Sequence, residues 1–161
     1  AGFSLECDLL GGQSNMVRVV DVVRGITALP LLVRVPAGSA QDVANAVTDL
    51  AAVGCDAAIV GGPWPALAVD PATGKPALVG NLHGPAVRPL ALRLVHDVSR
   101  LLGPEHIPLI GAGGVSSAED AAAFLAVGAS AVLLESVLWV DPQAVLRMAD
   151  AATSPSCRYL P

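Results

Sequence analysis

A glycine-rich turn after an apolar run holds the residue types in this sequence that could do chemistry. Residues 107–136 read IPLIGAGGVSSAEDAAAFLAVGASAVLLES. In the turn, Gly111, Gly113 and Gly114 follow a predicted strand and precede a predicted helix. Glycines let backbone N–H groups come close to an anion, and a helix N-terminus adds the positive end of its dipole. The spacing therefore predicts a corner of the type that holds a phosphate group.

The next predicted strand ends on a residue that opposes this chemistry. Phosphate corners of this kind usually take a second cluster of N–H groups from a glycine at that strand end, but here the sequence is Leu134-Glu135-Ser136. A carboxylate about 4 Å from a phosphate would repel it by about 4 kcal/mol at an effective dielectric near 20. We therefore expect weak phosphate binding at the glycine corner.

The other polar candidates have less specific patterns. Glu6 and Asp8 share one face of a strand and could form an acid pair or a cation site, or a strand end paired with Arg34 on the following strand. The glycine turn lacks the full G-x-G-x-x-G of a dinucleotide site. Metal-ligand spacing is missing among the three histidines, His83, His96 and His106. We predict no metal site, and expect Trp64 and Trp139 to serve as core or interface anchors.

Composition excludes several classes of partner. The 161 residues are 53% hydrophobic and only 14% charged, with a net charge of −5 and no run of Arg or Lys. Nucleic acid is therefore not an expected partner. No apolar stretch reaches the roughly 18–20 residues that span a bilayer, so we expect no membrane insertion. Cys7 and Cys55 lie in apolar runs and are predicted to be buried thiols, which suits a cytoplasmic protein.

The elements that must position these residues recur along the chain. Five apolar runs bounded by Gly and Pro read as buried strands: Gly2–Leu10, Pro30–Val35, Asp56–Gly61, Ile107–Gly111 and Ala129–Leu134. Helical patterns fill the gaps, beginning at Ser14, Ser39, Val87, Ser117 and Asp141-Pro142. The third helix shows an apolar stripe: Val87, Leu90, Ala91, Leu94, Val95, Val98, Leu101 and Leu102. The chain is therefore expected to be α/β, with five consecutive βα units.

Five βα units imply a parallel sheet with right-handed crossovers. A closed (β/α)8 barrel needs about 250 residues, so the 161 residues predict a single domain, 1–161, that is a partial, or half, TIM-type barrel. Its two unpaired strand edges are prone to association. We expect a homo-oligomer or a partner protein chain to cover them. Residues 62–84 form a Gly- and Pro-rich lid-like loop at a strand end.

Two stretches carry a resemblance to a known family. Residues 81–95, NLHGPAVRPLALRLV, are similar to the motif G-L-S-G-P-A-x-K-P-x-A-L-R-x-V of the dihydroorotate dehydrogenases, and residues 107–115 to their I-P-I-I-G-x-G-G-I. Over residues 3–142 the chain resembles the C-terminal half of the cytosolic class, which has a lid hairpin near residues 68–71. The resemblance implies a (β/α)8 barrel that binds FMN at the strand ends and oxidises a dihydropyrimidine.

The resemblance also shows which functional positions differ. Against the family's E-L-N-x-S-C-P-N this chain reads ECDLLGGQ from Glu6, so the family's Asn becomes Asp8 and its catalytic base falls at Gly11. Glycine has no side chain to accept a proton. The flavin-binding Lys of the family's V-K-L becomes Arg34, a rigid fork rather than an ammonium.

Further departures affect the flavin site. The family's Asn-Thr becomes Gly62-Pro63, and its final G-T becomes Glu135-Ser136. The glycines that survive from the phosphate corner are Gly111, Gly113 and Gly114. We therefore expect no catalytic residue and no cofactor. Our hypothesis is a catalytically degenerate dihydroorotate dehydrogenase-like domain that acts as a structural or assembly subunit. The alternatives are an FMN-dependent oxidoreductase completed by a partner chain and a sensor of a small molecule or anion.

Overall fold

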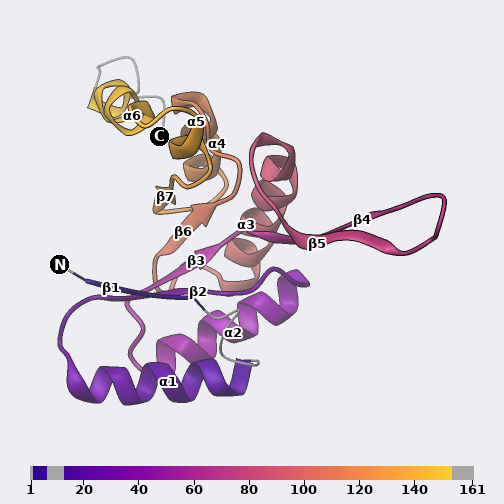
Figure 1. Cartoon of the computed structure of the whole chain (residues 1–161). Coiled ribbons are helices and arrows are strands. Elements are labelled where there is room, and N and C mark those ends of the chain that lie inside the picture. The colour runs from indigo at the N-terminus through magenta and orange to yellow at the C-terminus, as the bar shows by residue number, and fades with distance from the viewer. Residues whose placement is uncertain (1, 7–12, 154–161) are drawn as a thin grey trace.

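The protein is described here from a computed structural model, which describes residues 2–6 and 13–153. Its centre is a parallel sheet in the order β1-β2-β3-β6-β7 (Figure 1). The strands are β1 (Phe3–Glu6), β2 (Leu31–Arg34), β3 (Ala57–Val60), β6 (Leu109–Ala112) and β7 (Ala131–Leu133). Each lies inside or overlaps one of the five apolar runs. The expected fold, an α/β domain with part of a TIM-type barrel, is confirmed.

A helix follows each strand of this sheet. The helices are α1 (Gln13–Ile26), α2 (Ala40–Ala52), α3 (Arg88–Leu102), α4 (Ala118–Ala126) and α6 (Ala144–Thr153). Two short elements were not expected from the sequence, the 3-10 turn η2 (Pro85–Val87) and the single-turn helix α5 (Val137–Val140). In Figure 1, α1 and α2 lie together on one side of β1 and β2.

The main core lies between the sheet and its helices. Leu31 and Val33 of β2 are fully buried there, in the same apolar cluster as Val43 and Val47 of α2. Side chains alternate between the two faces of a strand, so Leu32 and Arg34 point to the opposite face of the sheet, away from the helices. Arg34 is nevertheless buried.

The helix starts only partly match the sequence predictions. Ser39 caps α2 by accepting a hydrogen bond from Asp42 N, and Ser117 with Asp120 forms a complete capping box on α4. The prediction that Ser14 caps the first helix is wrong, because α1 already includes Gln13. Asp141 caps the start of the last helix as predicted, since its Oδ1 accepts a hydrogen bond from Gln143 N at 3.2 Å just before α6 begins at Ala144.

The apolar stripe predicted for the third helix is too wide. Ala91, Leu94, Val95 and Val98 are buried in α3, as expected. The two outer members of the stripe, Leu90 and Leu101, are half exposed. A helix that packs on one layer of neighbours covers only a stripe about 100° wide, and these two residues fall at or beyond its margins.

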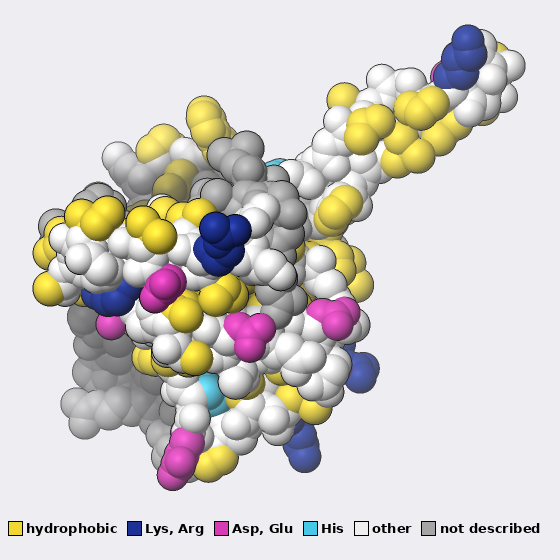
Figure 2. Space-filling view, turned by 90° about the horizontal axis from the view of Figure 1, so that it is seen from below, with side chains coloured by type: hydrophobic (Ala, Val, Ile, Leu, Met, Phe, Trp, Pro, Cys, Tyr) yellow, Lys and Arg dark blue, Asp and Glu magenta, His cyan; other side chains and the backbone are white. Residues whose placement is uncertain are grey.

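The segment predicted as a lid-like loop contains an antiparallel hairpin. Strands β4 (Trp64–Val69) and β5 (Pro76–Leu82) form a separate two-stranded sheet that projects from the body (Figure 1). Figure 2 shows hydrophobic side chains along this arm, and its exposed large residues are Leu67, Val69, Leu78, Val79 and Leu82. At its base Trp64 packs on the core and donates from Nε1 to the Gly61 carbonyl at 2.9 Å.

Candidate functional site

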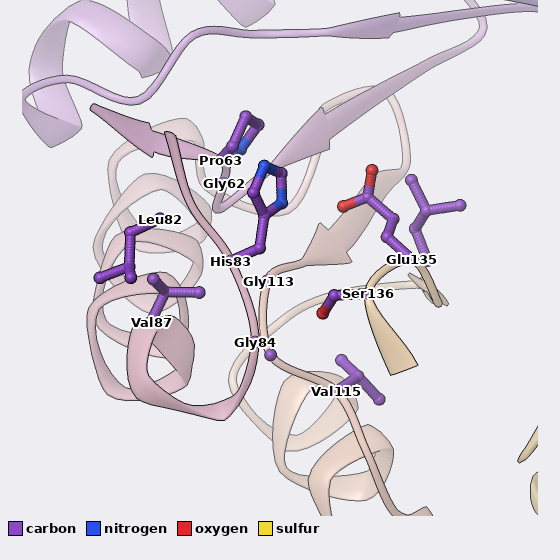
Figure 3. Close-up of a pocket in the computed structure, with 12 residues that line it drawn as sticks. Gly62, Pro63, Leu82, His83, Gly84, Val87, Gly113, Val115, Glu135 and Ser136 are labelled. Carbon is purple, nitrogen blue, oxygen red and sulfur yellow. The ribbon is translucent and has the colours of Figure 1, made fainter. Parts of the chain in front are cut away.

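A small pocket lies where the carboxyl ends of β3, β6 and β7 meet the base of the hairpin (Figure 3). Its lining includes Gly62, His83, Gly113, Glu135 and Ser136. Figure 3 shows the His83 ring and the Glu135 carboxylate reaching into the space between these segments. The interior has room for about one water molecule. Strand ends of parallel α/β folds are where ligands usually bind, so this is the candidate site.

Arg34, the last residue of β2, contacts two residues that line this pocket. Its guanidinium donates from Nη1 to the Gly62 carbonyl at 2.6 Å, and its Nη2 forms an ion pair with Glu135 Oε1. The Arg34 side chain is only 3% exposed, whereas that of Glu135 is 33% exposed. The cation is thus held in the interior, and its carboxylate partner lies at the pocket surface.

Arg34 and Glu135 lie at the ends of strands that are not neighbours in the sheet. β3 and β6 separate β2 from β7, so three strand spacings of about 4.8 Å would place the two ends roughly 14 Å apart in a flat sheet. The register aligns Arg34 with Ile59, Ile59 with Ile110, and Ile110 with Ala131. Ala131 and Leu133 of β7 share the face of Arg34, and Glu135 follows two residues after β7 ends. The ion pair therefore joins the ends of two strands that are three places apart in the sheet.

The three glycines predicted for the phosphate corner have two different roles. Gly113 and Gly114 line the pocket, but Gly111 does not. A Cβ on Gly111 would lie 2.5 Å from Cδ1 of Phe124, a fully buried side chain of α4. Gly111 is therefore required for packing of the strand against the helix, and its part in an anion corner stays a prediction.

Gly113 and Gly114 have positive φ angles of 110° and 77°. A Cβ on Gly113 would lie 2.9 Å from the Gly61 carbonyl oxygen, and one on Gly114 would lie 2.7 Å from the Gly84 carbonyl oxygen. The loop after β6 thus packs directly on the backbone after β3 and before η2. These contacts require glycine whether or not an anion binds nearby.

An ion pair below the glycine corner fixes α4 to α3. Asp120 pairs with Arg88 and accepts hydrogen bonds from the Ser116 amide, at 3.0 Å, and from the Ser116 hydroxyl, at 2.8 Å. Burial raises the pKa of the Asp120 carboxyl, but these hydrogen bonds and the Arg88 charge outweigh burial and leave that pKa below its ordinary value. The loop 113–116 is therefore held at its far end by a charged cluster.

Several predicted candidates lie away from the pocket or outside the described residues. Cys7, Asp8 and Gly11 lie outside the described residues. His96 contacts Asp97 at 3.0 Å and His106 contacts the Ile107 carbonyl at 2.6 Å, both through Nδ1. Within residues 2–6 and 13–153 there is no group of three or more His, Cys, Asp or Glu side chains that could hold a metal ion.

The two tryptophans differ in their surroundings. Trp64 is partly buried and packs against the core, which fits a core anchor. Trp139 in α5 is 90% exposed, and its neighbour Val140 is 88% exposed.

In the described part of the chain, no helix is long and apolar enough to cross a membrane.

Sequence reasoning identified Arg34 and Glu135 separately but missed their pairing. Glu135 was expected to face a phosphate, whereas its carboxylate faces the Arg34 guanidinium. The signal was available in principle, because the two residues carry opposite charges and end strands of one sheet. The two residues are 101 positions apart in the sequence, so no local pattern connects them.

Comparison with known proteins agrees with this architecture. The sequence profile of the family described as dihydroorotate dehydrogenase matches residues 10–152. The chain is 37% identical over 137 residues to the dihydroorotate dehydrogenase B (NAD(+)) catalytic subunit of Desulforamulus reducens, covering 83% of this chain and 44% of that protein. It is 38% identical over 130 residues to the protein of the same name from Pelobacter propionicus, covering 79% and 41%.

A solved structure shows the same fold. The crystal structure of DHODH in complex with ferulenol from Eimeria tenella aligns with a TM-score of 0.66 at 17% identity, over 88% of this chain and 44% of that one. The chain thus spans less than half the length of these relatives.

Proposed function

Given that this chain belongs to the dihydroorotate dehydrogenase family, we propose that it is a catalytically degenerate member without flavin chemistry of its own. In this proposal it acts as a structural or assembly subunit. The observation that supports this most is the ion pair between Arg34 and Glu135.

The residues of the pocket do not fit FMN. The resemblance places Arg34 where the family has its flavin-binding Lys, yet here its charge is already neutralised by Glu135. The Glu135 carboxylate lines the same pocket as Gly113 and Gly114, so it occupies the side from which a phosphate would need N–H donors.

An assembly role is supported by the sheet edges. In the described part of the five-stranded sheet, β1 pairs only with β2 and β7 only with β6, so each has an open edge. Open parallel edges are prone to pair with other chains. We propose that a second copy or a partner protein chain covers them. Static light scattering tests this, and a stable monomer of about 16 kDa at high micromolar concentration, melting cooperatively, would contradict it.

We further propose that the subunit works in the cytoplasm. Cys55 is a buried thiol whose Sγ donates to the Ala57 carbonyl at 3.1 Å. Burial raises the pKa of this thiol, which keeps it protonated and unreactive. A buried thiol of this type suits a reducing compartment.

The second candidate function is an FMN-dependent oxidoreductase whose remaining barrel strands and base come from a partner chain. It is favoured by the relatives above, which are named catalytic subunits and are 37–38% identical to this chain. This candidate requires the Arg34–Glu135 pair to open when FMN binds.

One experiment separates the two functions. Flavin absorbs near 370 and 450 nm, so an absorbance scan of the purified protein detects any bound flavin. If the protein carries no flavin, titration with FMN measures its affinity for FMN. We expect colourless wild-type protein that binds added FMN weakly. Glu135→Gly should bind FMN more tightly, whereas the control Ser136→Gly, which changes the next residue in the same pocket without a charge, should not. Wild-type protein that purifies with nearly one FMN per chain would overturn the proposal in favour of the oxidoreductase.

A further inference from the structure

An exposed tryptophan and an apolar pocket beside it make one surface of this chain complementary to itself. Trp139 of α5 is 90% exposed, and the next residue, Val140, is 88% exposed. Val140 also lines a second pocket, of about 270 Å³, together with Pro85, Val115 and Val137. We propose that two copies of this chain associate about a two-fold axis, with the Trp139 indole of each copy seated in this pocket of the other. The inference rests on the proposed assembly role and deepens it, because it names the partner.

The pocket has the size and the chemistry that an indole ring requires. At about 30 Å³ per water molecule, its volume is room for about nine non-hydrogen atoms, the number in an indole ring. Val115, a buried member of its apolar wall, and Ser136 lie on facing segments (Figure 3). A buried indole N–H needs an acceptor. Ser116 supplies one at the pocket, because its hydroxyl donates to Asp120 Oδ2 at 2.8 Å and keeps its oxygen lone pairs.

The charges around this surface favour contact between identical copies. A two-fold interface brings the same patch of both copies together, so every unpaired charge in the patch meets its like. Among the described residues that line the pocket there is no Asp, Glu, Lys or Arg. Directly after α5, Asp141 forms an ion pair with Arg147 of the same chain. The whole chain has a net charge of −5, which opposes self-association elsewhere on its surface but not at this patch.

The area that a reciprocal contact buries approaches that of a specific dimer. A Trp side chain buries about 150–250 Å², and the pocket wall that it covers loses a similar area, so two contacts account for about 600–1,000 Å². Val145 and Leu146 of α6, 44% and 65% exposed, extend the apolar surface next to α5. Their burial would bring the total towards the roughly 1,200–2,000 Å² of standard interfaces.

Sedimentation velocity over a range of concentrations measures the dimer dissociation constant of four proteins: wild type, Trp139→Ser, Ser136→Phe and Ile26→Ser. The first substitution removes the indole, and the second fills the pocket. Ile26→Ser is the matched control, because Ile26 is 80% exposed and lies on α1, far from α5 (Figure 1). We expect the dissociation constant to rise about 100-fold or more in the first two variants, since buried Trp anchors are typical hot spots and each dimer loses two. The control should match wild type.

A mixture of Trp139→Ser with Ser136→Phe tests the reciprocal geometry. The mixed dimer regains one of the two contacts, because the first variant keeps its pocket and the second keeps its tryptophan. We therefore expect the mixture to associate more tightly than either variant alone. Should Ser136→Phe fail to fold, Val140→Glu takes its place, since it puts a carboxylate at the rim of the pocket through a side chain that is 88% exposed.

Three results would overturn this inference and leave assembly through the sheet edges standing: a wild-type dimer that Trp139→Ser does not weaken, an equal loss in the control, or a mixture no tighter than its components. A wild-type chain that stays monomeric at high micromolar concentration overturns the inference and the proposed assembly through a second copy together. Wild-type protein that purifies with FMN defeats the proposed loss of flavin chemistry, whatever the sedimentation shows.

Discussion

Substitution of Gly111 by alanine tests whether this glycine serves packing or anion binding. A Cβ at this position would lie 2.5 Å from Cδ1 and 3.1 Å from Cγ of Phe124. The ring is fully buried and cannot turn outward. The strand cannot move aside easily either, because Gly111 is paired with Val60 on one side and Val132 on the other. We therefore expect Gly111→Ala to destabilise the fold.

The expected magnitude follows from the size of this overlap. Insertion of a methyl group into a well-packed core costs about 1–3 kcal/mol. For a domain of this length each kcal/mol lowers the melting temperature by about 2–4 °C, so a decrease of roughly 2–12 °C is expected. Gly38→Ala is the matched control, since its Cβ would meet nothing within 4 Å and its φ is not positive. That variant should stay within about 0.5 kcal/mol of wild type.

Thermal and urea unfolding of both variants give the measurement. A double-mutant cycle with Phe124→Leu locates the cause, because a smaller side chain at residue 124 should relieve part of the cost of Gly111→Ala. The coupling energy between the two positions should be about 0.5–3 kcal/mol. Our reasoning is wrong if Gly111→Ala is as stable as wild type, or if its cost is unchanged in the Phe124→Leu background.

Three further predictions concern charge and dynamics. The folded-state pKa of Asp120 is lowered, so its stabilising effect is present above its ordinary value of 3.8 and is lost as the pH falls below it. The stability difference between wild type and Asp120→Asn in urea titrations should therefore shrink below about pH 4, and a constant difference would contradict this. Asp56→Ala removes an ion pair with Arg24 and a 2.7 Å hydrogen bond from Leu31 N, and should cost only about 1 kcal/mol in urea unfolding because Asp56 is half exposed. Amides of the hairpin 64–82 should exchange hydrogen faster than those of β3, and equal protection would show that another surface covers the hairpin.

The fold could be predicted from the sequence because its signals are local. Continuous apolar runs bounded by Gly and Pro located all five parallel strands, and Ser117 with Asp120 located the start of α4. Local patterns could not show which outer positions of α3 lack a covering neighbour, so the predicted apolar stripe includes Leu90 and Leu101 although both are half exposed. The hairpin was implied by the family resemblance and not by periodicity, since its exposed strands lack a consistent buried face.

The candidate site was less predictable because its main contact joins residues that are 101 apart in the sequence and lie at the ends of strands that are not neighbours. In the sequence, Arg34 stands where the family has its flavin-binding lysine, and Glu135 is a carboxylate that would repel a phosphate. Considered separately, each change is unfavourable for binding of FMN. A buried guanidinium without a counterion strongly destabilises the folded state, and a carboxylate at the end of a barrel strand adds little stability by itself. In the folded chain each residue neutralises the other, so the pair replaces the interaction that a bound anion would make with the cation. The proposed function therefore predicts that this contact disfavours a phosphate-bearing cofactor, because the guanidinium already has a carboxylate partner.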